Sequence, residues 1–579
     1  MYDLKISGGT VLDGSGARGQ VADVGIREGR IVDIGPALGA ARETLSAEGK
    51  IVAPGFVDVH THYDAQVFWD PTLSPSCYHG VTTVIGGNCG FSIAPLNPEA
   101  GNYLLPMLAR VEGMPQETLK AGVPWDWQSF GDYLGRIENR IAVNAGFMVG
   151  HSAVRRVAMG ERATGEQATA DDMQRMKSLV TRSLKEGALG FSTTVSPTHN
   201  DAEGRPVPSR HATREELLAL ASLVKDFEGT MLELLPNLNF DEGTAELLTD
   251  FSLAGARPVN WNVLALGGSD EASVARAKKQ LAATDYARAR GAEVIALTFA
   301  GAPTIRINLV SGFVFDALNG WAPLFRLPLA ERMQRLRDSA YRTQLDESAK
   351  TSQGTFGRLA CWETFRIVEV HSAANRDFVG KTVGDIAKAQ NKRPIDALID
   401  IALADELKTS FMPPAGGEDD DTYRLRAKLW TDNRTVVGAS DAGAHMDMID
   451  TFAFSTQLLG KSRQLELIPI EEAVRQLTSV PARLAGLRER GELRVGWHAD
   501  VVVFDPATVG CGPVYTKFDL PGTREGRLYA DALGIPHVIV NGKTIVRDGA
   551  LMPARPGTVI RSGRDTYTVK LQGRQPATA

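Results

Sequence analysis

The most informative stretch of the chain is Ile51-Val52-Ala53-Pro54-Gly55-Phe56-Val57-Asp58-Val59-His60-Thr61-His62, an apolar run that ends in two histidines. Side chains alternate between the two faces of a strand, so His60 and His62 project from the same face and can reach one metal ion. A His-x-His pair alone is equally compatible with a solvated loop or a buried histidine pair. Following an apolar run, the pair predicts a metal site at the carboxyl end of a strand.

The sequence around this pair, residues 49–62, resembles the signature of the amidohydrolase superfamily of metal-dependent hydrolases. Residues 80–90, Gly-Val-Thr-Thr-Val-Ile-Gly-Gly-Asn-Cys-Gly, are similar to the second barrel strand of the N-acyl-D-amino-acid deacylases (D-aminoacylases), in which the cysteine binds metal. Further segments that resemble this family are residues 150–152, 187–193, 438–445, 490–493, 496–505 and 538–543. The resemblance covers nearly the whole chain and is weakest between residues 228 and 434.

Two kinds of pattern divide the chain. Short alternating strands separated by glycine-rich turns open it, and a matching set returns after Ala499. Between them, strand-like runs alternate with amphipathic helices, which indicates an α/β fold with parallel strands. The resemblance implies a (β/α)8 TIM-like barrel over residues 51–487, and beside it a small β-sandwich built from residues 1–50 and 488–579.

Local signals refine this division. Thr169 and Thr213 each precede a helical pattern and are followed three residues later by an acidic residue, which predicts a helix start at both. Strands are expected at residues 190–193, 229–235, 259–264 and 294–299. Residues 300–376 do not fit the barrel rhythm and are predicted to form an inserted cap over the active-site mouth. The alternative is a surface excursion with no role in binding.

Composition excludes some classes of partner. The net charge is −6 and the pI is about 6.0, which gives no electrostatic case for binding nucleic acid or an anionic membrane. There is no run of about twenty apolar residues, and the first residues read as a strand rather than a signal peptide. Only four cysteines occur in 579 residues, which suits a reducing compartment. A cytoplasmic enzyme is therefore expected.

The candidate metal ligands are His60, His62, Cys89 and Asp441. Thiolate is a good ligand for zinc, although a buried cysteine is commonly an inert packing residue. By resemblance, Asp441 in Ala-Ser-Asp-Ala-Gly-Ala-His matches the last-strand aspartate that binds metal and transfers a proton during hydrolysis. Its alternative role is to cap the following helix. The expected cofactor is one Zn²⁺ or another divalent ion.

The chain also departs from the family it resembles. D-aminoacylases carry two further metal histidines, one on the fifth strand and one on the sixth. The corresponding residues 230–236 and 257–263 contain none, and no histidine occurs between His211 and His371. The lysine that follows those histidines is also missing, so a single metal is predicted. Glu233 offers a carboxylate on the fifth strand, but its position there is expected to be one place out of register and to face away.

Five side chains are candidates for substrate contacts: His151, Arg155, Glu233, Arg306 and His445. His151 ends an expected strand, where a polar residue at the barrel rim is an equally good interpretation. Arg155 and Arg306 offer guanidinium groups for a substrate carboxylate, and each is also compatible with a structural role. His445 lies four residues after Asp441, close enough to donate a hydrogen bond in the transition state.

The resemblance implies hydrolysis of the amide bond in an N-acyl-(D-)amino acid or a related acylated or cyclic amide, with Asp441 as general base and then general acid. One alternative is a lyase, such as a decarboxylase, that uses one metal on the same fold. Another is a metal-poor binding protein, against which the joint presence of His60, His62, Cys89 and Asp441 argues. The expected partner is a small-molecule amide, and the resemblance is compatible with a homo-oligomer.

Overall fold

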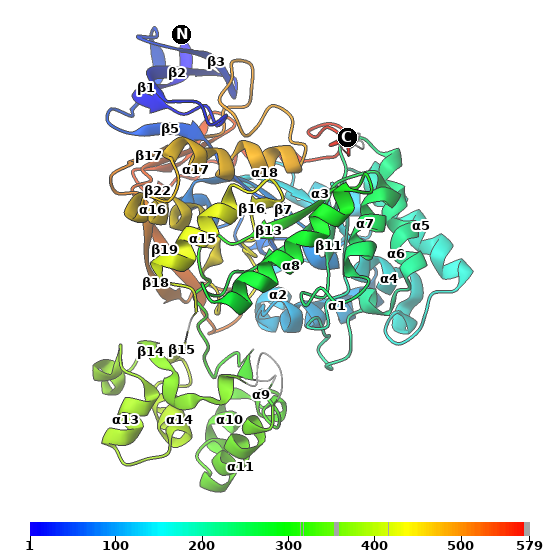
Figure 1. Ribbon diagram of the computed structural model, residues 1–579, viewed down its shortest axis with the longest axis vertical. Coiled ribbons are helices and arrows are strands. Elements are labelled where there is room, and N and C mark those ends of the chain that lie inside the picture. The colour runs from blue at the N-terminus through cyan, green and yellow to red at the C-terminus, as the bar shows by residue number, and fades with distance from the viewer. Residues whose placement is uncertain (313, 316–317, 353–357, 415, 572–579) are drawn as a thin grey trace.

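A computed structural model describes residues 1–312, 314–315, 318–352, 358–414 and 416–571 of the chain. Parallel strands, each buried on both faces, form the centre of the molecule (Figure 1). These strands are β6 (Phe56–Asp58), β7 (Val81–Gly86), β8 (Asn144–Phe147), β9 (Val149–Gly150), β10 (Gly190–Thr194), β11 (Met231–Leu235), β12 (Val259–Leu264), β13 (Val294–Thr298) and β16 (Thr435–Val437). Burial on both faces explains why their sequences are apolar runs rather than alternating patterns.

The parallel strands make two arcs that meet at both ends. One arc runs β6-β7-β8, and the other runs β16-β13-β12-β11-β10-β9. Only Met148 separates β8 from β9, and a parallel bridge between Thr61 and Ala442 joins the first strand to the last. The α/β class predicted from the sequence is confirmed, and the strands close on one another around a common interior.

Helices follow the strands along the chain and cover the outside of the arcs (Figure 1). They are α1 (Pro98–Val111), α2 (Gln116–Gly122), α3 (Phe130–Ile137), α4 (His151–Met159), α5 (Ala170–Lys185), α6 (Arg214–Ala221), α7 (Thr244–Gly255), α8 (Glu271–Arg288), α15 (Asp420–Trp430), α16 (Phe454–Leu465), α17 (Ile470–Leu477) and α18 (Ser479–Leu484). The predicted helix starts are confirmed, because the Thr169 hydroxyl accepts from Asp172 N–H and the Thr213 hydroxyl accepts from Glu216 N–H.

Both ends of the chain join in one nine-stranded sheet. Its strands are β1 (Tyr2–Val11), β2 (Gln20–Arg27), β3 (Arg30–Gly35), β4 (Ala41–Ser46), β5 (Ile51–Pro54), β17 (Val501–Phe504), β20 (His537–Val540), β21 (Lys543–Arg547) and β22 (Ala550–Leu551). In this sheet β5 lies between β1 and β17. Gly55 alone connects β5 to β6, so the sheet anchors the first strand of the barrel.

The last part of the chain does not all belong to this sheet. The hairpin of β18 (Gly510–Lys517) and β19 (Arg527–Leu533) forms its own two-stranded sheet, and Leu528 N–H donates to the Met446 carbonyl near the barrel mouth. Strand β23 (Val559–Ile560) pairs with β8 of the barrel. The expectation that residues 488–579 form only an outer domain is therefore corrected.

A separate lobe is inserted after β13, at the end of the molecule opposite the nine-stranded sheet (Figure 1). Its main elements are α9 (Ala322–Phe325), α10 (Leu329–Arg335), α11 (Ser339–Lys350), β14 (Arg366–Glu369), α13 (Val383–Ala389), α14 (Pro394–Ala404) and β15 (Ser410–Met412). The rings of Trp321 and Trp362 lie 5.3 Å apart in its own hydrophobic core, which extends from Ile307 to Phe411. The insertion was expected to end at residue 376, but α13 and α14 bury their apolar faces in this core.

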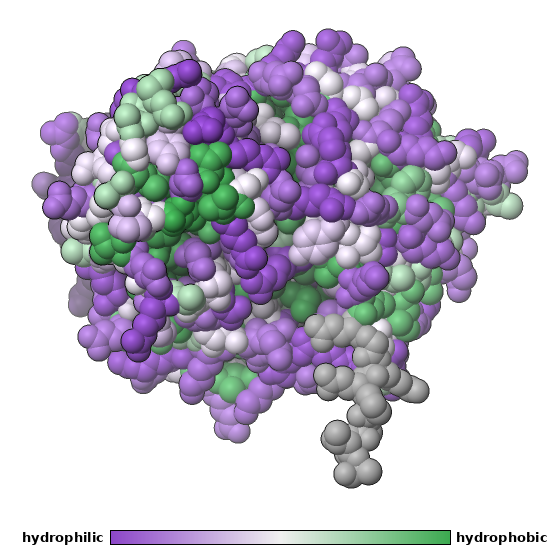
Figure 2. All heavy atoms as spheres, turned by 90° about the horizontal axis from the view of Figure 1, so that it is seen from above, coloured by the Kyte–Doolittle hydropathy of each residue, from purple (hydrophilic) through white to green (hydrophobic). Residues whose placement is uncertain are grey.

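The face of the molecule opposite the inserted lobe is largely polar. Figure 2 views the molecule from the end of the nine-stranded sheet, where hydrophilic side chains cover most of the surface and apolar areas are scattered between them. Among the helices that the structure describes, none has both the length and the apolar character needed to cross a membrane.

Candidate metal centre

Two histidines leave the first barrel strand with their rings on the same side. His60 and His62 follow β6 and are buried, at 0% and 3% exposure. Hydrogen bonds hold the backbone between them: Thr61 N–H donates to the Ile85 carbonyl at 3.0 Å, and His62 N–H donates to the Ala442 carbonyl at 2.7 Å. The ring centroids are 5.4 Å apart. Neighbouring strands on both sides therefore position the two imidazoles.

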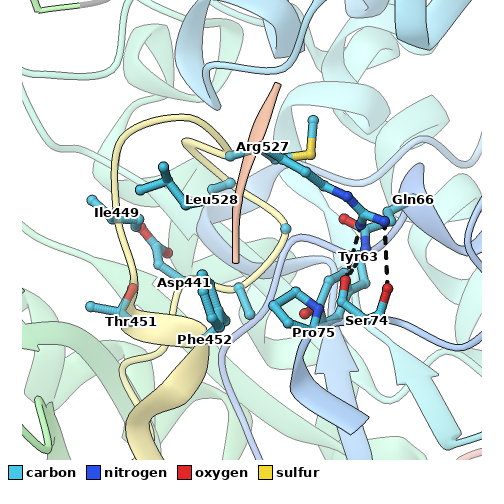
Figure 3. A pocket seen from close by; sticks show the side chains of 14 residues that line it. Tyr63, Gln66, Ser74, Pro75, Asp441, Ile449, Thr451, Phe452, Arg527 and Leu528 are labelled. Atoms are coloured by element: carbon cyan, nitrogen blue, oxygen red, sulfur yellow. Dashed lines mark hydrogen bonds between the residues drawn. The ribbon is translucent and has the colours of Figure 1, made fainter. Parts of the chain in front are cut away.

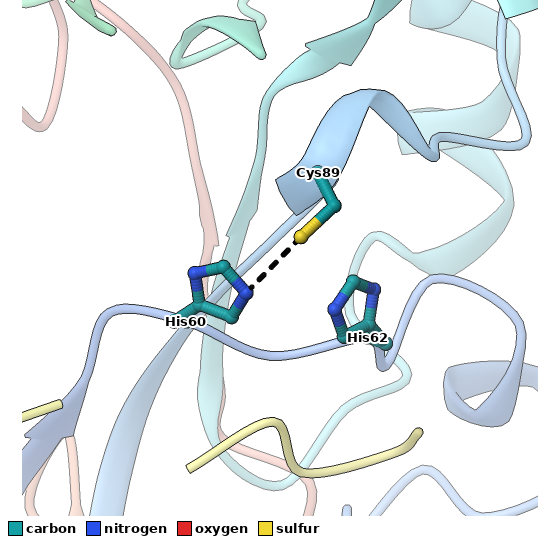
Figure 4. A group of neighbouring side chains, drawn as sticks. All are labelled: His60, His62 and Cys89. Atoms are coloured by element: carbon teal, nitrogen blue, oxygen red, sulfur yellow. Dashed lines mark hydrogen bonds between the residues drawn. The ribbon is translucent and has the colours of Figure 1, made fainter. Parts of the chain in front are cut away.

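Cys89 brings a thiol to the same point. It lies in the short turn Asn88–Gly90 that follows β7, and its Sγ is 3.5 Å from His60 Nε2. Figure 4 shows the thiol directed toward the space between the two imidazoles. One donor atom from each of His60, His62 and Cys89 lies within 4.8 Å of the others. The structure brings these three predicted ligands together.

The turn that carries Cys89 depends on a glycine. Gly87 has φ +72°, and a Cβ at this position would lie 2.2 Å from the Met148 carbonyl oxygen. Cys89 itself has φ +56°, a conformation that non-glycine residues rarely adopt and that is common at functional sites. The Asn88 side chain donates to the Thr61 carbonyl at 3.1 Å. This bond ties the cysteine turn to the backbone between the histidines.

Asp441 completes the cluster from the last strand. It follows β16, and its Oδ1 lies 3.4 Å from His60 Nε2 and 3.2 Å from His62 Nε2. Burial opposes ionisation, but hydrogen bonds with the two imidazoles outweigh it and hold the pKa of this carboxyl well below its ordinary value. The side chain of Asp441 is 23% exposed, whereas those of His60 and His62 are buried. Within the cluster, Asp441 is the member that reaches open space.

Glu233 faces the same interior, so the expectation that it points away from the site was wrong. In β11 it pairs with Ser192 of β10, whose hydroxyl accepts from Gly90 N–H at 3.0 Å inside the barrel. Glu233 Oε2 accepts from Cys89 N–H at 2.8 Å, and its Oε1 is buried without a hydrogen-bond partner among the described residues. Burial raises the pKa of the Glu233 carboxyl to about 8. The register set by neighbouring strands, rather than the strand's own sequence, decides this orientation.

Glu112 was missed by the sequence analysis. It ends α1, is 3% exposed, and places Oε1 3.5 Å from His62 Nδ1. Burial raises the pKa of the Glu112 carboxyl to about 7. For His62, burial lowers the pKa, but Glu112 and Asp441 outweigh it and raise the value to about 10. A carboxylate on one ring nitrogen fixes the orientation of the other, which here faces Asp441.

Two further imidazoles lie beside the cluster. His445 has φ +46°, and its backbone N–H donates to the Glu112 carbonyl at 2.5 Å. His199, in the loop after β10, contacts the Phe91 ring at a centroid distance of 4.9 Å. Burial lowers the pKa of His445 to about 4 and that of His199 to about 3, so both rings are neutral at pH 7. His199 was not considered from the sequence, where its only signal was its place after the fourth barrel strand.

Three side chains that were predicted to contact the substrate instead contact other residues of the protein. His151 Nε2 lies 2.9 Å from Glu216 Oε1, and Arg155 donates to both oxygens of the same carboxylate at 2.5 Å. Arg306 donates to Glu369 at 2.8 Å and to a carbonyl of the β18–β19 hairpin. Each of these three side chains therefore has a partner within the protein, and a substrate-binding role for His151, Arg155 and Arg306 stays a prediction.

One side of Asp441 is closed. Between the Tyr63–Pro75 region and the β18–β19 hairpin lies a cavity of about 20 Å³, which has room for about one water molecule. Figure 3 shows Arg527 reaching across this side to Ser74, whose carbonyl oxygen accepts from its guanidinium at 3.0 Å.

A second cavity, of about 540 Å³, opens toward the lobe. His199 and His445 line it, together with residues of the loops after β12 and β13. Val314 and Leu359 of the lobe contribute to the outer wall. The cavity therefore lies where the carboxyl ends of the barrel strands meet the inserted lobe, the usual place for a ligand in this type of fold.

The donor set of the cluster fits a divalent cation. Two imidazoles, a thiol and a carboxylate are the ligand types that zinc prefers. Burial and the nearby carboxylates raise the pKa of the Cys89 thiol well above its ordinary value. Glu233, Asp441 and Glu112 contribute to that shift, so several acidic groups gather in a buried space. A bound cation would offset their repulsion.

Comparison with known proteins gives consistent matches along the chain. The model of the Amidohydrolase family matches residues 43–546. The chain is 28% identical over 572 residues to D-aminoacylase of Alcaligenes xylosoxydans xylosoxydans, and this match covers 96% of the chain and 97% of that protein.

Two solved structures are similar over 97% of this chain and 100% of their own, each at 26% identity. One, with a TM-score of 0.64, is a D-aminoacylase studied for its binuclear metal centre, with one-metal activation and second-metal attenuation. The other, with a TM-score of 0.63, is N-acyl-D-glutamate deacylase from Bordetella bronchiseptica in complex with zinc and a phosphonate inhibitor that mimics the tetrahedral intermediate.

Proposed function

The chain belongs to the amidohydrolase family and is an enzyme acting on carbon–nitrogen bonds other than peptide bonds, and we propose that it hydrolyses the amide bond of an N-acyl-amino acid. The D series is the first candidate, followed by related acylated or cyclic amides. The observation that carries this proposal is the convergence of His60, His62, Cys89 and Asp441 beside a cavity at the barrel mouth. The similarity to two deacylases over nearly the whole chain supports the choice of substrate.

We assign one divalent ion, with zinc as the first candidate, to His60, His62, Cys89 and Asp441. Glu233 is proposed as a further ligand in place of the missing histidines, because its Oε1 is buried beside Cys89 without a partner among the described residues. A bound divalent cation supplies Lewis acidity, which polarises a carbonyl and lowers the pKa of water to about 7.

Asp441 is proposed to move the proton. Its carboxylate is ionised at neutral pH, since hydrogen bonds with the two imidazoles hold its pKa low. Oδ1 can accept a proton from the attacking water and then donate it to the leaving nitrogen. Oδ1 lies 3.4 Å from His60 Nε2 and 3.2 Å from His62 Nε2, which places it beside the residues assigned to the metal.

His445 and His199 are proposed to bind the reacting amide. Both line the cavity next to Asp441, and both are neutral at pH 7, so each carries one ring N–H and one acceptor nitrogen. A neutral imidazole that donates to the carbonyl oxygen stabilises the negative charge that develops there during attack. Fixed donors in a site that excludes water make this contribution large.

The test combines metal content with a matched substrate panel. Metal per chain is measured by plasma mass spectrometry, before and after dialysis against a chelator and then zinc. The same samples are assayed on N-acetyl-D- and N-acetyl-L-amino acids and on cyclic amides, with release of amine and of carbon dioxide followed separately. Zinc-dependent amine release that is lost in His60→Ala supports the proposal. Carbon dioxide release without free amine, or no turnover of any amide by the zinc-loaded protein, would overturn it.

A further inference from the structure

The cavity of about 540 Å³ is much larger than the reacting amide requires. This volume lies within the range of roughly 300–1,000 Å³ that is typical of pockets for small-molecule ligands. An acetyl group has three non-hydrogen atoms. Cavities of this size in proteins usually enclose most of a ligand's surface. Most of the space is therefore left for a part of the substrate that does not react.

The walls of this space are apolar. Side chains that contribute to them include Val111, Leu266, Phe299, Ile305, Val314 and Met448. Ile305 remains 39% exposed in the unliganded protein. Apolar walls of this kind favour a ligand that removes them from water.

The described residues that line the cavity provide few charged partners for a charged group of a ligand. Its cationic side chain is Arg426, whose guanidinium donates to the Gly417 carbonyl at 2.6 Å and to the Leu266 carbonyl at 2.8 Å. The polar end is elsewhere, at His199 and His445, which lie next to Asp441. The cavity thus has a polar end at His199 and His445, which interact electrostatically with Asp441, and an apolar body that extends toward the lobe.

We propose that this cavity binds a large apolar group of the substrate amide, with the amide itself at the His199–His445 end. The inference rests on the proposed function and adds the substrate class: an amide with a long aliphatic or aromatic group. Either the acyl half or the amine half can supply such a group, since the chemistry that the walls recognise is the same.

Two substrate series distinguish these sources. In the first, the acyl chain grows from acetyl to butanoyl, octanoyl and dodecanoyl on a fixed amino acid. In the second, N-acetyl is kept and the amino acid changes from glycine to leucine, phenylalanine and tryptophan. Burial of each additional methylene is expected to raise kcat/KM about fourfold. Octanoyl is longer than acetyl by about six methylenes, so it should exceed acetyl by about a thousandfold or more if the acyl half is fully buried in the cavity.

A variant that fills the cavity provides the control. Ala265 lines the cavity and is exposed, so Ala265→Trp occupies space without disturbing the core. The matched variant Ala275→Trp changes an exposed alanine on α8 outside the cavity. The preference for large groups should disappear in Ala265→Trp and persist in Ala275→Trp. Ala275→Trp should also cleave the acetyl substrate within about threefold of the parent.

The outcomes separate the two proposals. A rise in either series that Ala265→Trp abolishes supports the cavity assignment. If both series are flat while the acetyl substrate is cleaved, or if the rise persists in Ala265→Trp, the cavity assignment is wrong and the proposed function stands. If no member of either series is cleaved by the zinc-loaded enzyme, the proposed function fails as well.

Discussion

The backbone N–H of Cys89 donates a 2.8 Å hydrogen bond to the carboxylate of Glu233. This bond fastens the turn after the second barrel strand to the fifth strand. It uses only one of the two carboxylate oxygens, and the other is buried with no hydrogen-bond partner among the described residues. Burial raises the pKa of this carboxyl to about 8, and a bound cation would favour its ionised form.

The first prediction concerns Glu233. Glu233→Gln preserves the shape and the acceptor for Cys89 N–H but removes the charge, so zinc affinity should fall by more than about tenfold, as even outer partners of a metal site contribute this much. Competition with a chromophoric chelator measures the affinity directly. Glu233→His should bind zinc more tightly than Glu233→Gln. Equal affinity in the parent and in Glu233→Gln would exclude Glu233 from the ligand set.

The second prediction concerns the thiol. Cys89→Ser should reduce the zinc retained after chelator dialysis, and the cobalt-loaded variant should lose the near-ultraviolet absorption that a thiolate ligand gives. Cys361 is an exposed free cysteine, so Cys361→Ser serves as the matched control. Unchanged metal content and an unchanged cobalt spectrum in Cys89→Ser would assign this residue to packing alone.

The third prediction concerns the proton carrier. Asp441→Asn should lower kcat by about a hundredfold or more, because the amide cannot accept a proton from water. Circular dichroism should show an unaltered fold. Asp421→Asn is the control, since that side chain is 81% exposed and pairs with Arg424 at the surface. Substantial turnover by Asp441→Asn would place the general base on another residue.

The fourth prediction concerns Glu112. Its carboxylate is 3.5 Å from His62 Nδ1, so Glu112→Gln should weaken zinc binding by about 10- to 100-fold through loss of orientation of His62. A positioning role predicts partial rescue by Glu112→Asp, and the zinc titration of both variants tests this. Full affinity in Glu112→Gln, with the fold intact, would remove the residue from the metal centre.

The fifth prediction concerns stability. At Gly87 a Cβ would lie 2.2 Å from the Met148 carbonyl oxygen, and φ is +72°. Gly87→Ala should lower the free energy of unfolding by at least about 2 kcal/mol, from left-handed strain and overlap together. Gly135 on α3 has open space around it, so Gly135→Ala should raise stability by about 0.5–1 kcal/mol. Denaturant titration compares the two, and similar stabilities would contradict the steric argument.

The sequence predicted those parts of the site that depend on short spacing. His60 and His62 share a face because strand geometry alone determines it, and the cysteine turn could be recognised from its glycines. Glu112 and His199 could not be found in this way. Each reaches the centre because a helix end or a loop packs against a distant strand, and no local pattern encodes that contact.

The same difference between local spacing and contacts of distant segments explains what could not be predicted. Glu233 was expected to face away because its register was counted along one strand, whereas pairing with Ser192 sets it. Arg155 and Arg306 were considered for substrate because of their charge, but their partners Glu216 and Glu369 are remote in sequence. The α/β class was predictable because strand and helix patterns alternate, while the end of the inserted lobe depends on which core α13 and α14 join.

The nine-stranded sheet has a consequence for how the protein is made. Translation delivers β5 early and its neighbour β17 only near the end, so a growing chain carries His60, His62 and Cys89 beside an unpaired strand edge for most of its synthesis. Such an edge invites pairing with other chains. Fragments that stop before Val501 should therefore contain the metal-binding residues yet aggregate, and expression of this enzyme should depend on protecting the nascent N-terminal half.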